Sequence, residues 1–217
     1  MRLFILNYRV RNMVGDDFQL HCQTGSLITK SFNEIPFPLL DMPLRYKLNK
    51  GAKLTNCLSQ GAIISPGLIV DDKIKSILDS YKLMAHKYYK IELMDELSTF
   101  NLSYYWIQLN ESLFNEIDYV KSKFVEYHLA EKIGDVKINS YSDYLELRKT
   151  KGWRCSIDAK EIRLKFNSPL VDWDLFVLRP FSNEIFISKR LKDAFELNGI
   201  TGIDIIDNDK VFIDLSN

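Results

Sequence analysis

Two stretches of the chain repeat one pattern of apolar and polar positions. Residues 68–89 and 185–206 each begin with a short apolar run, pass through a polar residue into an amphipathic segment, and end in a second apolar run. In both amphipathic segments the apolar residues have the spacing of one helix face. Asp71 and Ser188 stand where a helix N-cap is needed, and Gly199 suits a helix C-terminus. Each stretch therefore predicts a strand, a capped helix and a returning strand.

The two stretches align without a gap when Ile69 is set against Phe186. Apolar residues then match along the strand, the helix face and the returning strand, and the two caps coincide. Three charged pairs also agree in sign: Lys73/Arg190, Lys75/Lys192 and Asp79/Glu196. The agreement indicates an internal duplication. Because the matched positions have packing or capping roles, we interpret the repeat as scaffold rather than as a binding site.

Alternating apolar and polar residues predict strands in most of the remaining chain. These are residues 2–10, 17–22, 26–32, 86–93, 103–109, 135–139, 174–180, 184–188 and 211–215. Residues 153–157 and 162–166 are expected to pair as a hairpin across a four-residue loop. Residues 140–152 predict a further helix, capped by Ser140 or Ser142 and ended by Gly152.

Two segments carry weaker patterns. Three prolines within residues 34–48 favour an extended connection over a central strand. Residues 113–134 fit neither period, and we interpret them as extended. The sum is an α+β fold, mostly antiparallel sheet with a few packed helices, in one globular unit over residues 1–217. The duplication would divide this unit into half-units 1–110 and 111–217.

Composition narrows the range of partners. Lys plus Arg and Asp plus Glu number 29 each, and the basic residues are scattered, which disfavours nucleic acid as a partner. No run approaches the ~18 apolar residues of a membrane span, so no membrane partner is expected. Cys22, Cys57 and Cys155 are odd in number and widely spaced, as in a protein of the reducing cytoplasm.

Candidate chemistry is sparse. His21, His86 and His128 have no partner at a metal-binding spacing, and we expect neither a metal nor another cofactor. The strongest acidic pair is Asp172 with Asp174, which would share one face of a strand and so could serve an acid/base or metal site. The competing interpretation is a polar edge beside a buried strand, and Asp207 and Asp209 then mark a solvated turn.

Aromatic residues suggest where a partner would bind. Tyr104–Trp106 is most simply a packed strand, although an exposed aromatic patch would instead indicate a protein interface. Tyr141, Tyr144 and Trp153, on and after the helix of residues 140–152, are candidate partner-binding residues. The oligomeric state is left open.

Residues 172–206, "DWDLFVLRPFSNEIFISKRLKDAFELNGITGIDII", carry a recognisable order of motifs. Asp-x-Phe at residues 174–176 is followed by an apolar strand ending in Ser188, then Arg-Leu-Lys at 190–192 and Gly-Ile-Thr-Gly at 199–202. This order resembles the C-terminal signature of the DUF1629-like bacterial immunity proteins, including immunity protein 11 and immunity protein 43, of polymorphic toxin systems. The first stretch is similar to the middle of such proteins, with Asp71 in place of the expected Ser.

The resemblance covers the chain from about Pro66 onward and consists of packing motifs. It implies a protein without enzymatic activity that binds a cognate protein toxin and neutralises it. Two alternatives stay open. One is a carboxylate-dependent enzyme, with or without a metal, that uses Asp172 and Asp174. The other is a structural or adaptor domain.

Overall fold

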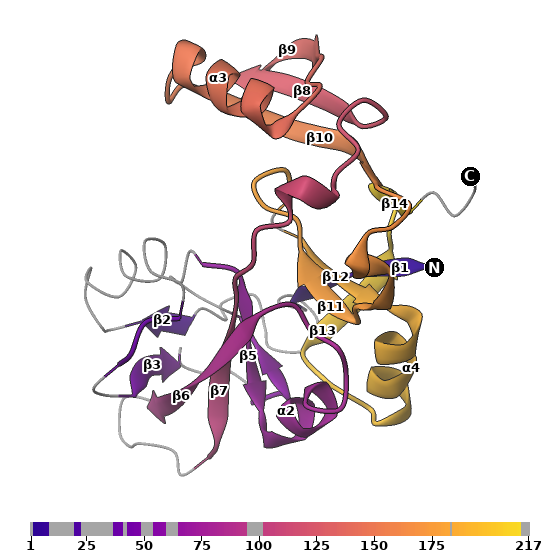
Figure 1. Cartoon of the computed structure of the whole chain (residues 1–217). Helices are drawn as coiled ribbons and strands as arrows, with labels where there is room; N and C mark the ends of the chain where they lie inside the picture. The colour runs from indigo at the N-terminus through magenta and orange to yellow at the C-terminus, as the bar shows by residue number, and fades with distance from the viewer. Residues whose placement is uncertain are drawn as a thin grey trace.

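The computed structural model describes residues 2–8, 20–22, 37–40, 43–48, 54–59, 65–94, 102–182 and 184–213. Within these ranges the chain forms three sheets, mostly antiparallel, with helices packed against them (Figure 1). The expected α+β fold is therefore confirmed. The helices are α2 (Asp72–Leu78), α3 (Tyr141–Lys151) and α4 (Lys189–Leu197), with short 3-10 turns η1 (Phe114–Glu116) and η2 (Pro169–Asp172).

The first sheet has the strand order β2-β3-β6-β7-β5-β4 and the second has the order β11-β12-β1-β13. The strands of the first are β2 (Leu20–Cys22), β3 (Leu44–Leu48), β4 (Cys57–Leu58), β5 (Gly67–Asp71), β6 (His86–Met94) and β7 (Tyr104–Leu109). Those of the second are β1 (Leu3–Tyr8), β11 (Leu175–Val177), β12 (Ile185–Ser188) and β13 (Ile203–Asp207).

The two repeated stretches adopt the same arrangement in these sheets. In the first, β5 and β6 flank β7 and both run antiparallel to it, with α2 as the connection. In the second, β12 and β13 flank β1 in the same way, with α4 as the connection. The register agrees as well: Trp106 pairs with Ile69 and Tyr89, and Ile5 pairs with the residues aligned with these two, Phe186 and Ile206.

The edge strands and the loops before the returning strands also correspond between the two sheets. We call each repeated stretch, together with its central and edge strands, a copy. β4 pairs with β5 as β11 pairs with β12. The backbone N–H of Met84 donates to the carbonyl of Leu175 at 3.0 Å, and that of Cys57 donates to Thr201 at 3.1 Å, so each copy contacts the edge strand of the other. The central strand of the second copy is β1, from the N-terminal end of the chain. The sheet thus joins residues from both sides of position 110.

The third sheet has the order β14-β10-β8-β9. Its strands are β8 (Lys123–His128), β9 (Glu131–Val136), β10 (Cys155–Leu164) and β14 (Val211–Ile213). In Figure 1, β8, β9, α3 and the start of β10 form a lobe that stands above the two matched sheets. Phe181 attaches the lobe, because its ring contacts Tyr119, Phe124 and Tyr144 with centroids 4.8 to 6.0 Å apart.

Several local expectations need correction. Residues 153–166 are not a hairpin: β10 runs without interruption through Asp158–Glu161, with a register shift between Ala159 and Glu161. The polar residues there belong to the exposed face of one long strand. Residues 44–48, expected in a connection, form β3 and pair in parallel with β6. Residues 113–134 divide into η1, β8 and the start of β9, and the expected strand at 26–32 lies outside the described residues.

Candidate functional site

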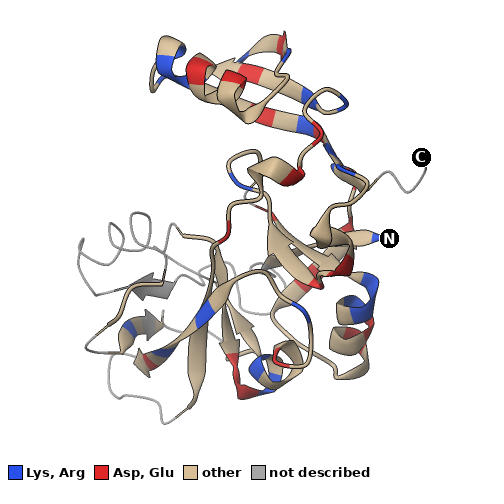
Figure 2. Cartoon of the chain, viewed as in Figure 1, with Lys and Arg blue, Asp and Glu red and all other residues tan. Residues whose placement is uncertain are grey.

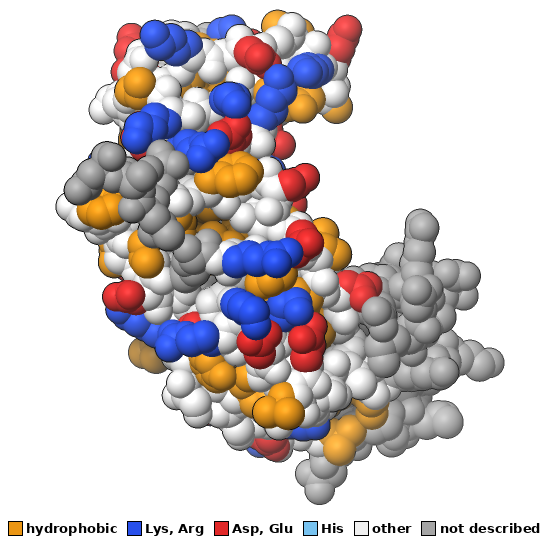
Figure 3. Space-filling view, turned by 90° about the vertical axis from the view of Figure 1, so that its right-hand side faces the viewer, with side chains coloured by type: hydrophobic (Ala, Val, Ile, Leu, Met, Phe, Trp, Pro, Cys, Tyr) orange, Lys and Arg blue, Asp and Glu red, His pale blue; other side chains and the backbone are white. Residues whose placement is uncertain are grey.

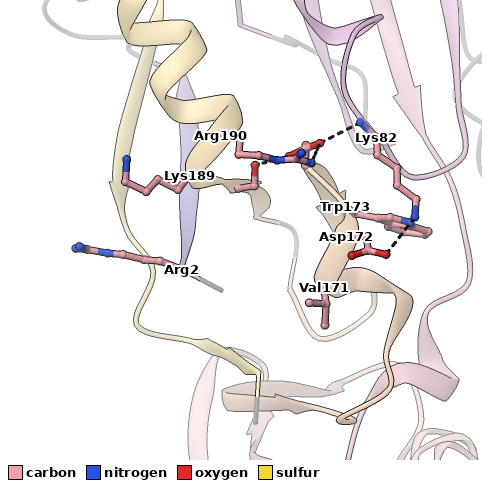
Figure 4. A pocket seen from close by; sticks show the side chains of 9 residues that line it. Arg2, Lys82, Val171, Asp172, Trp173, Lys189 and Arg190 are labelled. Carbon is pink, nitrogen blue, oxygen red and sulfur yellow. Dashed lines mark hydrogen bonds and ion pairs between the residues drawn. The ribbon is translucent and has the colours of Figure 1, made fainter. Parts of the chain in front are cut away.

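The Asp174 carboxylate lies at the junction of the two copies, where Lys82 after α2 and Arg190 of α4 both contact it. Figure 4 shows Lys82 and Arg190 at the pocket that they line. Its side chain is 1% exposed and accepts hydrogen bonds from the Ser188 hydroxyl at 2.5 Å and from the Lys82 backbone N–H at 3.1 Å. Arg190 adds two more, from Nη2 at 2.8 Å and from Nε at 3.2 Å. Ser188 is the N-cap of α4, so Asp174 links that helix to the loop that follows α2.

Asn56 holds the same place in the first copy. Its amide nitrogen donates to Asp71, the N-cap of α2, at 2.7 Å. Its carbonyl oxygen accepts from the backbone N–H and the hydroxyl of Thr201, at 2.9 and 2.8 Å, in the loop that follows α4. In one copy a neutral residue contacts an acidic cap, and in the other an acidic residue contacts a neutral cap. Each junction thus has a donor for every close acceptor.

The expected geometry of Asp172 and Asp174 is wrong. Asp172 ends η2 and its side chain is 75% exposed, at 3.6 Å from the Lys82 ammonium, whereas Asp174 precedes β11 and is buried. The two therefore do not project from one face of a strand. Both line a cavity of about 630 Å³, whose rim also carries Arg2, Lys82, Lys189 and Arg190. On the side of the molecule with α4 and the start of β1, basic and acidic side chains lie intermingled (Figure 3).

This cavity has the chemistry of a charged, solvent-open pocket. Each of its four cations has an acidic partner. Lys82 pairs with Asp172 and Arg190 with Asp174, whereas Arg2 pairs with Asp207 at 2.8 Å and Lys189 with Asp193 at 2.5 Å. The Asp174 oxygens are occupied by four donors, which hold the carboxylate in one orientation. In its described contacts, Asp174 thus acts as a hydrogen-bond acceptor that holds the two copies together.

The histidines and cysteines are dispersed. Among the described residues, no three His, Cys, Asp or Glu side chains lie close enough together to hold a metal ion. His86 Nδ1 lies 2.9 Å from the Met84 carbonyl, and His128 is exposed. Burial raises the pKa of the Cys57 thiol, and nearby Asp71 raises it further. Burial also raises the pKa of Cys155, with a contribution from Glu126. The side chains of His21 and Cys22 lie outside the described residues.

The aromatic candidates separate into packed and exposed residues. Tyr104 and Trp106 are buried in β7, as the packed-strand interpretation expects. Tyr144 is buried on the inner side of α3, and the ring of Tyr141 stacks on Phe114 with centroids 3.8 Å apart. Trp153, between α3 and β10, is 81% exposed.

Sequence reasoning missed the neighbour of Trp153. The turn between β8 and β9 consists of Leu129 and Ala130, and the backbone N–H of Leu129 donates to the Arg154 carbonyl at 3.0 Å. Leu129 is 61% exposed, and the Arg154 guanidinium lies 5.3 Å from the Trp153 ring centroid. The signal in the sequence was weak, since Leu-Ala is not a turn dipeptide. Only the pairing of β8 with β9 and β10 brings these residues to one end of the lobe.

No protein-family model matches the chain, and no curated protein matches it either. The likeness to the immunity proteins therefore remains a prediction from the signature motifs. In the described part of the chain, no helix has the length and apolarity needed to cross a membrane.

Proposed function

We propose that this protein is an immunity-type protein that binds a cognate bacterial toxin and neutralises it. The observation that supports the proposal is the set of hydrogen bonds that the signature residues make at the two junctions. Asp174, Ser188 and Arg190 form one hydrogen-bonded group, and Thr201 bonds to Asn56 at the matching junction. Residues that bond to one another in this way are required together for the two copies to dock. Proteins that share the signature are therefore expected to share the fold.

Gly202, the last residue of the signature, has an equally specific role. Its φ is +86°, and a Cβ atom there would lie 2.1 Å from the Cys57 carbonyl oxygen. Only glycine allows the loop after α4 to pass this close to β4. The signature is thus explained by the way the two copies dock, which leaves the outer surfaces of the fold free to differ between proteins with different partners.

The lobe supplies a surface for such a partner. It projects from the matched sheets (Figure 1). It also carries Trp153, most of whose surface is exposed to solvent. Exposed aromatic and arginine side chains are the residues that most often anchor protein interfaces. We place the action in the cytoplasm, because Cys57 and Cys155 are free thiols and unpaired cysteines suit a reducing compartment.

The test is co-expression with the toxin encoded by the neighbouring gene. We expect the chain to restore growth and to purify with the toxin as a complex of fixed stoichiometry. An unrelated protein of similar size is the control for the load of expression. If no neighbouring gene product is toxic, or if the chain neither protects nor binds, the proposal is wrong.

The same system separates binding from catalysis. A neutralising binder protects until the toxin exceeds it in molar amount, whereas an enzyme that acts through Asp172 and Asp174 protects at a small fraction of the toxin concentration. Protection titrated in a cell-free toxin assay gives this ratio directly. A ratio far below one would favour the carboxylate-dependent enzyme.

A further inference from the structure

One end of the lobe combines a strained turn, an exposed tryptophan and a run of basic residues. We define the lobe tip as Leu129, Ala130, Lys149, Trp153 and Arg154. It lies where the β8–β9 turn meets the segment between α3 and β10, as the pairing of Cys155 with His128 places it. Figure 2 shows basic residues gathered at this end of α3.

The first feature is backbone strain. Leu129 has φ +48° and Ala130 has φ +72°, so both residues of the turn occupy the left-handed region. A two-residue hairpin turn of this kind favours Asn-Gly, and residues with a Cβ atom are disfavoured there. A leucine that is 61% exposed gains little burial in return. Strain without a structural benefit marks a position held for another purpose.

The second feature is the exposed Trp153, whose ring centroid lies 5.3 Å from the Arg154 guanidinium. The third is charge. Residues 148–154, "RKTKGWR", contain four basic residues and no acidic one. Lys151 is neutralised by Glu126 at 2.6 Å, and Arg148 donates to the Cys155 carbonyl. Lys149 and Arg154 have no acidic partner among the described residues and remain free to meet an external one.

We propose that the lobe tip docks on an acidic face of the toxin domain, with Trp153 inserted in an apolar pocket of that face. This inference rests on the proposed function and names the surface and the partner chemistry. Leu129 and Ala130 extend the apolar contact beside Trp153. Lys149 and Arg154 lie at its margin, where complementary charges speed association and fix orientation.

A protein partner fits the tip better than a nucleic acid does. Phosphate binding needs many cations along a groove, whereas the tip offers two without an acidic partner and has Glu131 beside it. The apolar turn residues Leu129 and Ala130 also add nothing to phosphate contacts. They do add area to a protein interface whose centre is a buried tryptophan.

The experiment measures binding of the neighbouring toxin domain, inactivated at its own catalytic residue, by calorimetry and by biosensor kinetics. We expect Trp153→Ala to weaken binding by about 30-fold or more, as for a tryptophan at an interface centre. The double charge reversal Lys149→Glu with Arg154→Glu should slow association by about tenfold and reduce its dependence on salt.

The strain-relieving double substitution Leu129→Asn with Ala130→Gly distinguishes an effect on binding from an effect on folding. These variants suit the turn better than the native residues, so the protein should fold at least as well and yet bind more weakly. Leu197→Ala is the matched control for an exposed leucine, since Leu197 is 87% exposed at the end of α4. Lys165→Glu is the control for charge, at the opposite end of β10, roughly 30 Å away.

The outcomes are distinct. If the tip variants lose binding while both controls keep it, the proposal is supported. If the unaltered chain binds the toxin and all tip variants bind equally well, the tip proposal is overturned and the proposed function stands. If the unaltered chain neither binds nor protects, both fail. Tight binding of a labelled single-stranded oligonucleotide, lost in Trp153→Ala, would overturn the choice of a protein partner.

Discussion

Replacing Asp174 by alanine tests whether the junction stabilises the fold as its geometry indicates. The substitution removes the acceptor used by the Ser188 hydroxyl at 2.5 Å and by the Lys82 N–H at 3.1 Å. It also removes the ion pair with Arg190. Because Asp174 is 1% exposed, its partners lose an acceptor that is buried in the folded protein.

The magnitude follows from the three contacts. Leaving the buried Ser188 hydroxyl and the Lys82 N–H without an acceptor costs about 1–2 kcal/mol each. Arg190 contributes little, about 0–1 kcal/mol, because its side chain is 70% exposed and the ion pair is screened by solvent. The free energy of unfolding should therefore fall by about 3 kcal/mol. For a chain of this length that corresponds to a decrease in Tm of roughly 6–12 °C.

The assay is urea and thermal unfolding followed by circular dichroism. Arg190→Ala is the matched control and should change the free energy of unfolding by less than about 1 kcal/mol. Asp174→Asn preserves the shape and one acceptor, so it should lie between the two. If the free energy of unfolding of Asp174→Ala lies within about 1 kcal/mol of that of the unaltered protein, with the same urea dependence, the hydrogen bonds of Asp174 do not hold the copies together.

Three further predictions concern other parts of the fold. Gly202→Ala should greatly lower stability or soluble yield, because its Cβ atom would lie 2.1 Å from a backbone oxygen. Gly199→Ala has open space around the new Cβ atom and should lower the free energy of unfolding by only about 1 kcal/mol. Equal effects of the two substitutions in thermal unfolding would contradict this prediction. Burial raises the pKa of Tyr89 to about 12, and burial also raises the pKa values of Tyr88, Tyr104 and Tyr119. The stability that these neutral, buried phenols contribute is fully present below the ordinary tyrosine pKa of about 10 and is lost as the pH rises through 12. Ultraviolet titration should therefore show tyrosines that ionise late, together with unfolding. Complete ionisation of all tyrosines near pH 10 would refute the prediction. Leu129→Asn with Ala130→Gly should raise the free energy of unfolding by about 1–2 kcal/mol in urea, and a decrease would mean that the turn is not strained.

Much of the fold was readable from local patterns. Asp71 and Ser188 are N-caps, as the pattern predicted, and of the two candidates Ser140 and Ser142 it is Ser140 that caps α3. The gapless alignment of the repeats also holds in three dimensions, since Tyr88 and Ile205 occupy equivalent positions in their sheets. These features were predictable because helix faces, caps and strand alternation depend on residues only a few positions apart.

The site was less predictable. Of the three aromatic candidates, Trp153 is exposed, but Tyr141 and Tyr144 belong to the packing of α3. No turn signal in the sequence marks Leu129. An aromatic residue near a helix end has the same local sequence whether it lies inside or outside. Its exposure depends on elements such as η1 and Phe181 that are distant in the chain.

The sequence by itself determined the repeated strand-helix-strand units, their caps and the absence of a large charge excess. Only the tertiary structure decided that β1 completes the second copy and that Asn56 and Asp174 each join one copy to the other. It also decided that the side chain of Asp172 is exposed whereas that of Asp174 is buried. The reason is physical: local propensities act over a few residues, whereas strand partners and burial are selected by the apolar surface that the whole chain can remove from water.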